Sequence, residues 1–75
     1  MEEVNKILIE LFKLSSEEVE KDLTMNDIDS WDSLSHMNLI ATIEDACKIE
    51  LSGDDIAEMI SFEAIRKIVS KYMNL

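Results

Sequence analysis

The residues best suited to chemistry lie in and just after the segment Asp29-Ser30-Trp31-Asp32-Ser33-Leu34. Ser33 offers a hydroxyl that can be esterified, and the single histidine and single cysteine, His36 and Cys47, suggest a base and a nucleophile. Eleven residues separate these two on one predicted helix, about 16 Å at 1.5 Å per residue, so they cannot share a hydrogen bond. We therefore interpret them as a partly buried histidine and a core cysteine, and we expect no enzymatic activity.

Metal sites are not expected either. One Cys and one His cannot complete a structural zinc site. The acidic stretch of Asp27, Asp29 and Asp32 could suggest calcium, but no register supplies the spaced oxygen ligands, central Gly and final Glu of an EF-hand loop.

Composition bounds the class of protein. With 75 residues, 47% of them hydrophobic, we expect one compact domain spanning residues 1–75. The chain shows no membrane-length apolar run and no signal-peptide pattern, which predicts a cytoplasmic protein, and we expect a monomer. A formal net charge of -10 disfavours nucleic acid and anionic lipid and favours a basic protein partner.

The absence of proline and the presence of one glycine predict an all-α fold. A first helix is predicted to run to about Leu14, with an apolar face of Val4, Ile7, Leu8, Leu11 and Phe12. A capping box from Ser15 to Glu18 follows, and then a long loop that reaches Ser30 and contains one possible helical turn. Its expected anchors are Val19, Leu23, Ile28 and Trp31. Trp31 is either a core plug, which its usual burial favours, or a partner anchor.

A second helix is predicted from Asp32 to about Lys48, with an inward face of His36, Leu39, Ile40, Ile43, Ala46 and Cys47. Ser33, Met37, Ala41, Glu44 and Lys48 line a neighbouring stripe. Ser52 is expected to cap a short helix that holds Ile56, Met59 and Ile60. Ser61 is expected to cap a last helix, whose apolar face comprises Phe62, Ile65, Ile68, Val69 and Tyr72.

The Asp32-Ser33-Leu34 triplet stands where the long polar loop meets the second helix, and in this setting the chain resembles the acyl and peptidyl carrier protein family. The resemblance covers essentially the whole chain, including the Ile49-Glu50-Leu51 run and the two later helices. The triplet alone is a weak signal, because three common residues recur by chance, and its setting makes it specific. The resemblance implies an acyl-carrier-like bundle of three longer helices and one short one, with the long loop between the first and second.

In that family the serine of the triplet receives 4'-phosphopantetheine from coenzyme A, a role that falls on Ser33, with Asp32 and Leu34 as its flanking site residues. The implied function is to carry an acyl or aminoacyl group as a thioester. The implied partners are a phosphopantetheinyl transferase, a loading enzyme and a downstream synthase or transferase. A phosphodiester at a helix start would also meet unpaired N–H groups and the positive end of the helix dipole. The simpler reading is that Asp32 and Ser33 only cap the helix.

We expect partners to dock on Leu34, Met37, Ala41, Glu44 and Asp45, because these residues continue along the helix from the modified serine. Carriers of the housekeeping fatty-acid pathway usually have a small residue before the triplet, and acidic residues just after it and three positions later. This chain has Trp31, Ser35 and Asn38 there, which favours a carrier of a specialised pathway. The alternative from another class is a non-carrier acidic helical module that binds a basic protein.

Overall fold

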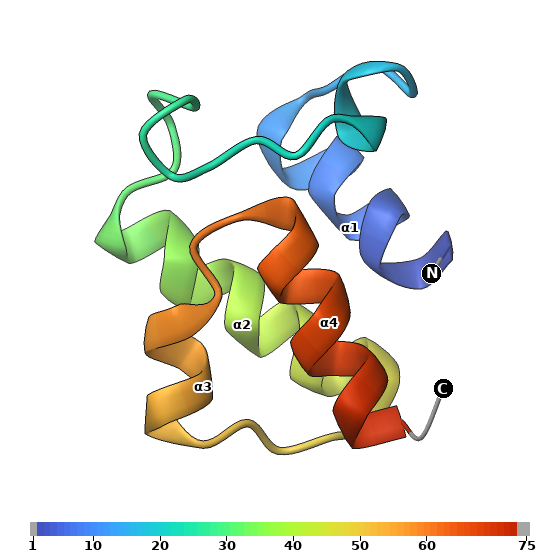
Figure 1. Ribbon diagram of the computed structural model, residues 1–75, viewed down its shortest axis with the longest axis vertical. Coiled ribbons are helices and arrows are strands. Elements are labelled where there is room, and N and C mark those ends of the chain that lie inside the picture. The colour runs from blue at the N-terminus through green and yellow to red at the C-terminus, as the bar shows by residue number, and fades with distance from the viewer. Residues whose placement is uncertain (1, 74–75) are drawn as a thin grey trace.

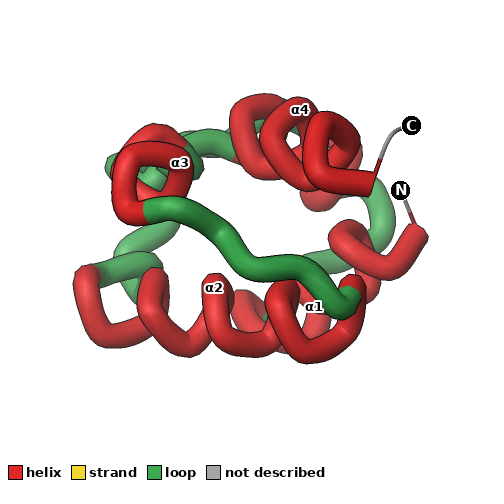
Figure 2. The backbone as a smooth tube through the Cα atoms, turned by 90° about the horizontal axis from the view of Figure 1, so that it is seen from below, coloured by secondary structure: helices red, strands yellow, loops and turns green. Residues whose placement is uncertain are grey.

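The computed structural model describes residues 2–73. Within that range the chain is all-helical, as predicted, with four α-helices and one short 3₁₀-helix (Figure 1). Their bounds are α1 Glu2–Phe12, η1 Glu18–Glu20, α2 Ser33–Cys47, α3 Gly53–Glu58 and α4 Phe62–Met73. Figure 2 shows α3 and α4 in one layer and α1 and α2 in the other.

The core lies between these two layers. Each long helix buries one face, and the fully buried side chains are Val4, Leu8, Leu39, Ile40, Ile43, Met59, Phe62, Ile65 and Val69. The buried residues of α1, α2 and α4 all lie on the predicted faces of these helices. Two predicted face residues, Leu11 and Tyr72, are only half-buried. The short helix α3 has no buried residue of its own, and Met59, which follows it, provides its main apolar anchor.

Three predicted placements are wrong. Ala46 was expected on the inward face of α2 but is exposed, because the buried face of that helix follows Leu39, Ile40 and Ile43 and reaches Cys47 only in part. Met59 and Ile60 are predicted inside the short helix, but α3 ends at Glu58. Met59 follows the helix as its C-cap, and Ile60 lies in the link to α4 with half of its surface exposed.

A lysine follows the last residue of two helices. Lys13, after α1, and Lys48, after α2, have left-handed backbone conformations with φ of 56° and 57°. In each case the next residue donates its N–H to a carbonyl five residues back, Leu14 to Ile9 at 3.0 Å and Ile49 to Glu44 at 3.2 Å, which closes the helix end. Glycine normally occupies this position, so the chain accepts some backbone strain at both ends.

The long loop is tied down at both ends. The predicted capping box is confirmed: the Ser15 N–H donates to Glu18 Oε1 at 2.9 Å, and the Glu18 N–H donates to Ser15 Oγ at 3.1 Å. Further on, the loop pairs with the link between α3 and α4 through Met25 N–H to Ile60 O and Phe62 N–H to Leu23 O, both 2.9 Å. All four expected anchors lie against the core, with Val19 and Trp31 buried.

Arg66 joins the first part of the chain to α4. Its Nε donates to Asn5 Oδ1 of α1 at 3.0 Å, and an Nη donates to the carbonyl of Val19 in η1. Its guanidinium also lies 5.9 Å from the centroid of the Phe62 ring. One partly buried cation therefore satisfies acceptors on two elements and covers an aromatic face.

Replacing Arg66 with Ala should lower the free energy of unfolding by about 2 kcal/mol, because the Val19 carbonyl and the Asn5 amide lose a charged donor. The neighbouring exposed residue Lys67 provides the matched control, and Lys67→Ala should change stability by less than about 0.5 kcal/mol. Urea unfolding monitored by circular dichroism measures both. Equal effects of the two variants would contradict the bridging role of Arg66.

Candidate functional site

The candidate site is the turn that opens α2. Asp32 is its N-cap, in an extended conformation, and its Oδ1 accepts the N–H of Ser35 at 2.9 Å while its carbonyl accepts the N–H of His36 at 2.8 Å. The hydrogen bond from the Ser35 N–H, followed by that from the Ser35 side chain, lowers the pKa of Asp32 below its ordinary value. Asp32 therefore stays ionised at neutral pH and fixes the first turn of the helix.

Ser33 is the first residue of α2 and its side chain is exposed. Next to it, 81% of the Leu34 surface and 55% of the Met37 surface are accessible to solvent. Leu34, Ser35, Met37 and Asn38 line a shallow depression there. An exposed hydroxyl thus stands beside apolar side chains that the core does not use.

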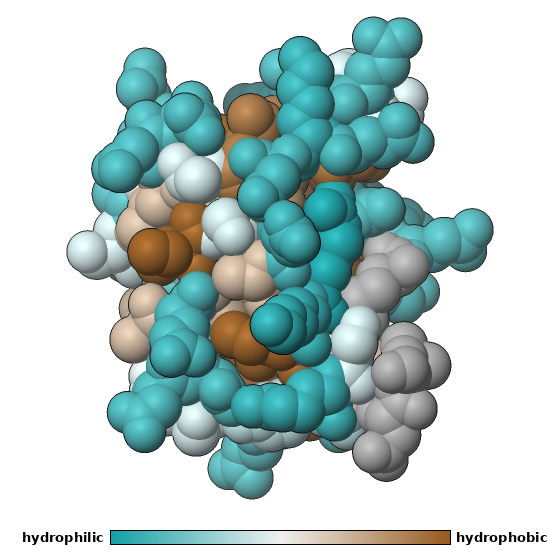
Figure 3. All heavy atoms as spheres, in the orientation of Figure 1, coloured by the Kyte–Doolittle hydropathy of each residue, from teal (hydrophilic) through white to brown (hydrophobic). Residues whose placement is uncertain are grey.

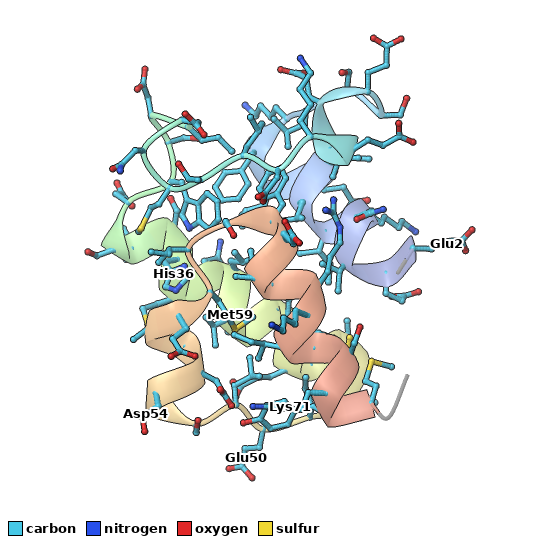
Figure 4. All side chains as sticks on the ribbon, in the orientation of Figure 1. Glu2, His36, Glu50, Asp54, Met59 and Lys71 are labelled. Atoms are coloured by element: carbon cyan, nitrogen blue, oxygen red, sulfur yellow. The ribbon has the colours of Figure 1, made fainter. Side chains whose placement is uncertain are left out.

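Hydrogen bonds of the buried residues Trp31 and His36 hold the first turn of α2 in place. The Trp31 indole N–H donates to His36 Nδ1 at 3.0 Å, and His36 Nε2 lies 2.9 Å from the carbonyl oxygen of Ile56 in α3. Because Nδ1 accepts a hydrogen bond, the neutral ring carries its proton on Nε2 and donates it to Ile56. Figure 4 shows His36 on α2 between the loop and α3. The histidine therefore connects the loop, the start of α2 and α3.

The indole itself is clamped by two rings. Trp31 is 3% exposed, and its ring centroid lies 5.2 Å from that of Phe12 in α1 and 5.7 Å from that of Phe62 in α4. Of the two readings of Trp31, the core plug is confirmed. Ser33 is exposed, although it lies only two residues after the buried Trp31 and three residues before the buried His36.

The five predicted docking residues differ in their surroundings. Leu34, Met37, Ala41 and Asp45 are exposed. Glu44 is half-buried, and its Oε2 accepts the N–H of Leu51 at 2.8 Å, so this carboxylate caps the segment that follows α2. Sequence periodicity places Glu44 on the stripe but gives no sign of this long-range bond.

A second polar cluster, not identified from the sequence, holds α3 against α4. Asp55 accepts hydrogen bonds from the Tyr72 hydroxyl and from Lys71 Nζ at 3.2 Å, and the Tyr72 hydroxyl accepts the N–H of Ser52 at 3.2 Å. The Tyr72 hydroxyl is the main cause that lowers the pKa of Asp55. These bonds explain how a helix without buried residues stays in place.

In the described part of the chain, no group of three or more His, Cys, Asp and Glu side chains could hold a metal ion. None of the helices between residues 2 and 73 is long and apolar enough to cross a membrane. No protein-family model and no curated protein matches the chain.

Trp31→Phe keeps an aromatic ring in the core but leaves His36 Nδ1 without its donor, so we expect a loss of about 1–3 kcal/mol in unfolding free energy. A double-mutant cycle with His36→Leu separates this bond from the change in ring size. The cycle, measured by urea unfolding with circular dichroism, should give a coupling of about 1 kcal/mol. A coupling below about 0.3 kcal/mol would show that the indole–imidazole bond does not stabilise the turn.

Proposed function

We propose that the chain is an acyl carrier protein in which Ser33 bears 4'-phosphopantetheine and presents a thioester-bound acyl or aminoacyl group to partner enzymes. The observation that carries the proposal is the setting of Ser33: an exposed hydroxyl at the first position of α2, within Asp32-Ser33-Leu34, on a turn held by Trp31 and His36. A hydroxyl so placed is open to a modifying enzyme, while its backbone is kept in one conformation.

The order of elements supports the same function. The resemblance implies three longer helices, one short helix before the last, and a long loop between the first two, and α1 to α4 have these lengths and this order. The long loop ends at the candidate serine, so its contacts with the core determine where Ser33 stands.

The surroundings of Ser33 fit the proposed arm. The side chain is exposed, so a phosphodiester on its oxygen can extend into solvent, and Leu34 and Met37 offer apolar surface beside it. The Asp32 carboxylate is bonded to the N–H of Ser35, which keeps it engaged with the helix. When attached, the arm supplies a thiol that forms a thioester with the cargo. The protein's own part is to hold Ser33 in a fixed, accessible position.

The docking surface follows from this geometry. A partner that reaches Ser33 meets Leu34, Met37 and Ala41 on the exposed side of α2, with Asp45 further along. Asp45 is a suitable site for testing charge, because it is exposed and Glu44 is engaged with Leu51. A carrier surface of this kind favours a partner with basic residues around an apolar patch.

Incubation with coenzyme A and a phosphopantetheinyl transferase of broad specificity should add the mass of one phosphopantetheine group to the wild-type chain. Ser33→Ala should abolish this gain. Ser30→Ala and Ser35→Ala provide matched controls and should keep it, because Asp32 accepts a main-chain N–H of residue 35 that alanine retains. Intact-mass spectrometry measures all four proteins.

Modification of the Ser33→Ala variant would move the site to another hydroxyl. A folded wild-type chain that several such transferases leave unmodified would contradict the carrier function and favour the acidic interaction module instead.

A further inference from the structure

A second shallow depression, whose apolar residues are the exposed Ile60 and the half-buried Met25, lies where the long loop crosses the link between α3 and α4. We name it the crossing surface: Thr24, Met25 and Asn26 from the loop with Ile60 and Ser61 from the link, which together line a shallow depression. Ile60 exposes 51% of its surface although it is a large β-branched apolar residue. In the view of Figure 3, apolar atoms are exposed on the side where the long loop meets this link.

Main-chain hydrogen bonds hold the two segments of the crossing surface together. An isolated antiparallel bridge joins Thr24 and Ser61, and the Met25 N–H donates to the Ile60 carbonyl at 2.9 Å. On the inner side of the link, Met59 and Phe62 are fully buried. Ile60 is therefore held outward between two core residues, and a partner that contacts it would lose little free energy to loop ordering.

Two carboxylates flank the crossing surface at fixed positions. Asp27 Oδ2 accepts the N–H of Thr24 at 2.9 Å, and Asp22 Oδ1 accepts the N–H of Glu63 at 2.9 Å. The chain as a whole has a formal net charge of -10, although Lys21 and Arg66 adjoin this part of the chain.

We propose that the crossing surface binds a basic protein surface that projects an apolar side chain onto Ile60 and Met25. The carboxylates of Asp22 and Asp27 and the net negative charge of the chain favour this occupant, because a second copy of the chain or an anionic lipid surface would bring like charges together. The interaction uses the two loops and not the exposed side of α2, and it does not require a modified Ser33.

The test uses a synthetic helical peptide with leucines along one face and lysines on the other, titrated into the full ¹⁵N-labelled chain. Amide shift changes should centre on Thr24, Met25, Asn26, Ile60 and Ser61, and binding should weaken as salt is added. Ile60→Asn should weaken binding about tenfold, as expected for a central apolar contact. The same peptide with glutamates in place of lysines should not bind.

Control variants test whether a loss of peptide binding is specific to the crossing surface. Met73→Asn removes an exposed methionine from the end of α4 and should leave the affinity unchanged, and Ile60→Val should retain most of it. Asp27→Asn keeps an acceptor for Thr24 while removing a charge, and should weaken binding at low salt only. Melting temperatures verify the fold of each variant.

Three results would overturn the proposal. The first is that the largest shifts fall on Leu34, Met37 and Ala41. The second is that folded Ile60→Asn binds the peptide like wild type. The third is that sedimentation shows a wild-type dimer that Ile60→Asn dissociates, which would make a second copy the occupant.

Discussion

The indole of Trp31 contacts most of the structure at once. Its ring lies between Phe12 of α1 and Phe62 of α4, and its N–H donates to His36 of α2, which in turn contacts the Ile56 carbonyl of α3. In a chain of 75 residues, which can bury only a small core, one large side chain shared by several helices is an efficient way to hold them together. The position of the second helix, and of everything it presents, depends on this contact.

Around Ser33, buried and exposed residues follow one another within a very short stretch of chain. Trp31 and His36 are buried, whereas Ser33 and Leu34 between them are exposed. Hydrogen bonds hold other weakly buried elements in the same way. The cluster around Asp55 joins α3 to α4, and the bond from the Phe62 N–H to the Leu23 carbonyl joins the long loop to α4. A protein whose partners act on one exposed group needs such a fixed platform, and the proposed carrier function would require one.

The helices could be predicted from the sequence because apolar periodicity and capping residues are local patterns. Apolar periodicity defined the three long helices, and Ser15, Ser52 and Ser61 each accept the N–H that a capping residue should accept. The predicted ends of the first two helices, about Leu14 and about Lys48, lie within two residues of the observed ends at Phe12 and Cys47, although no glycine marks them. The end of the short helix before Ile60 was less predictable, because six residues are too few for apolar periodicity to show where the helix ends. Contacts across the fold, such as Trp31 with His36 and Glu44 with Leu51, depend on tertiary packing and leave no sequence pattern.

The central claim, that the chain's chemistry is carried by an attached thiol, can be tested by the rate of thiol labelling before and after transferase treatment. Cys47 is half-buried, and burial together with the nearby Glu3 charge raises the pKa of its thiol, so it should react slowly with a disulfide reagent at neutral pH. We predict that the untreated chain shows this slow phase alone, and that treatment with transferase and coenzyme A, followed by removal of the free coenzyme A, adds one fast-reacting thiol per chain. A treated chain that still shows only the slow phase of Cys47 would contradict the account.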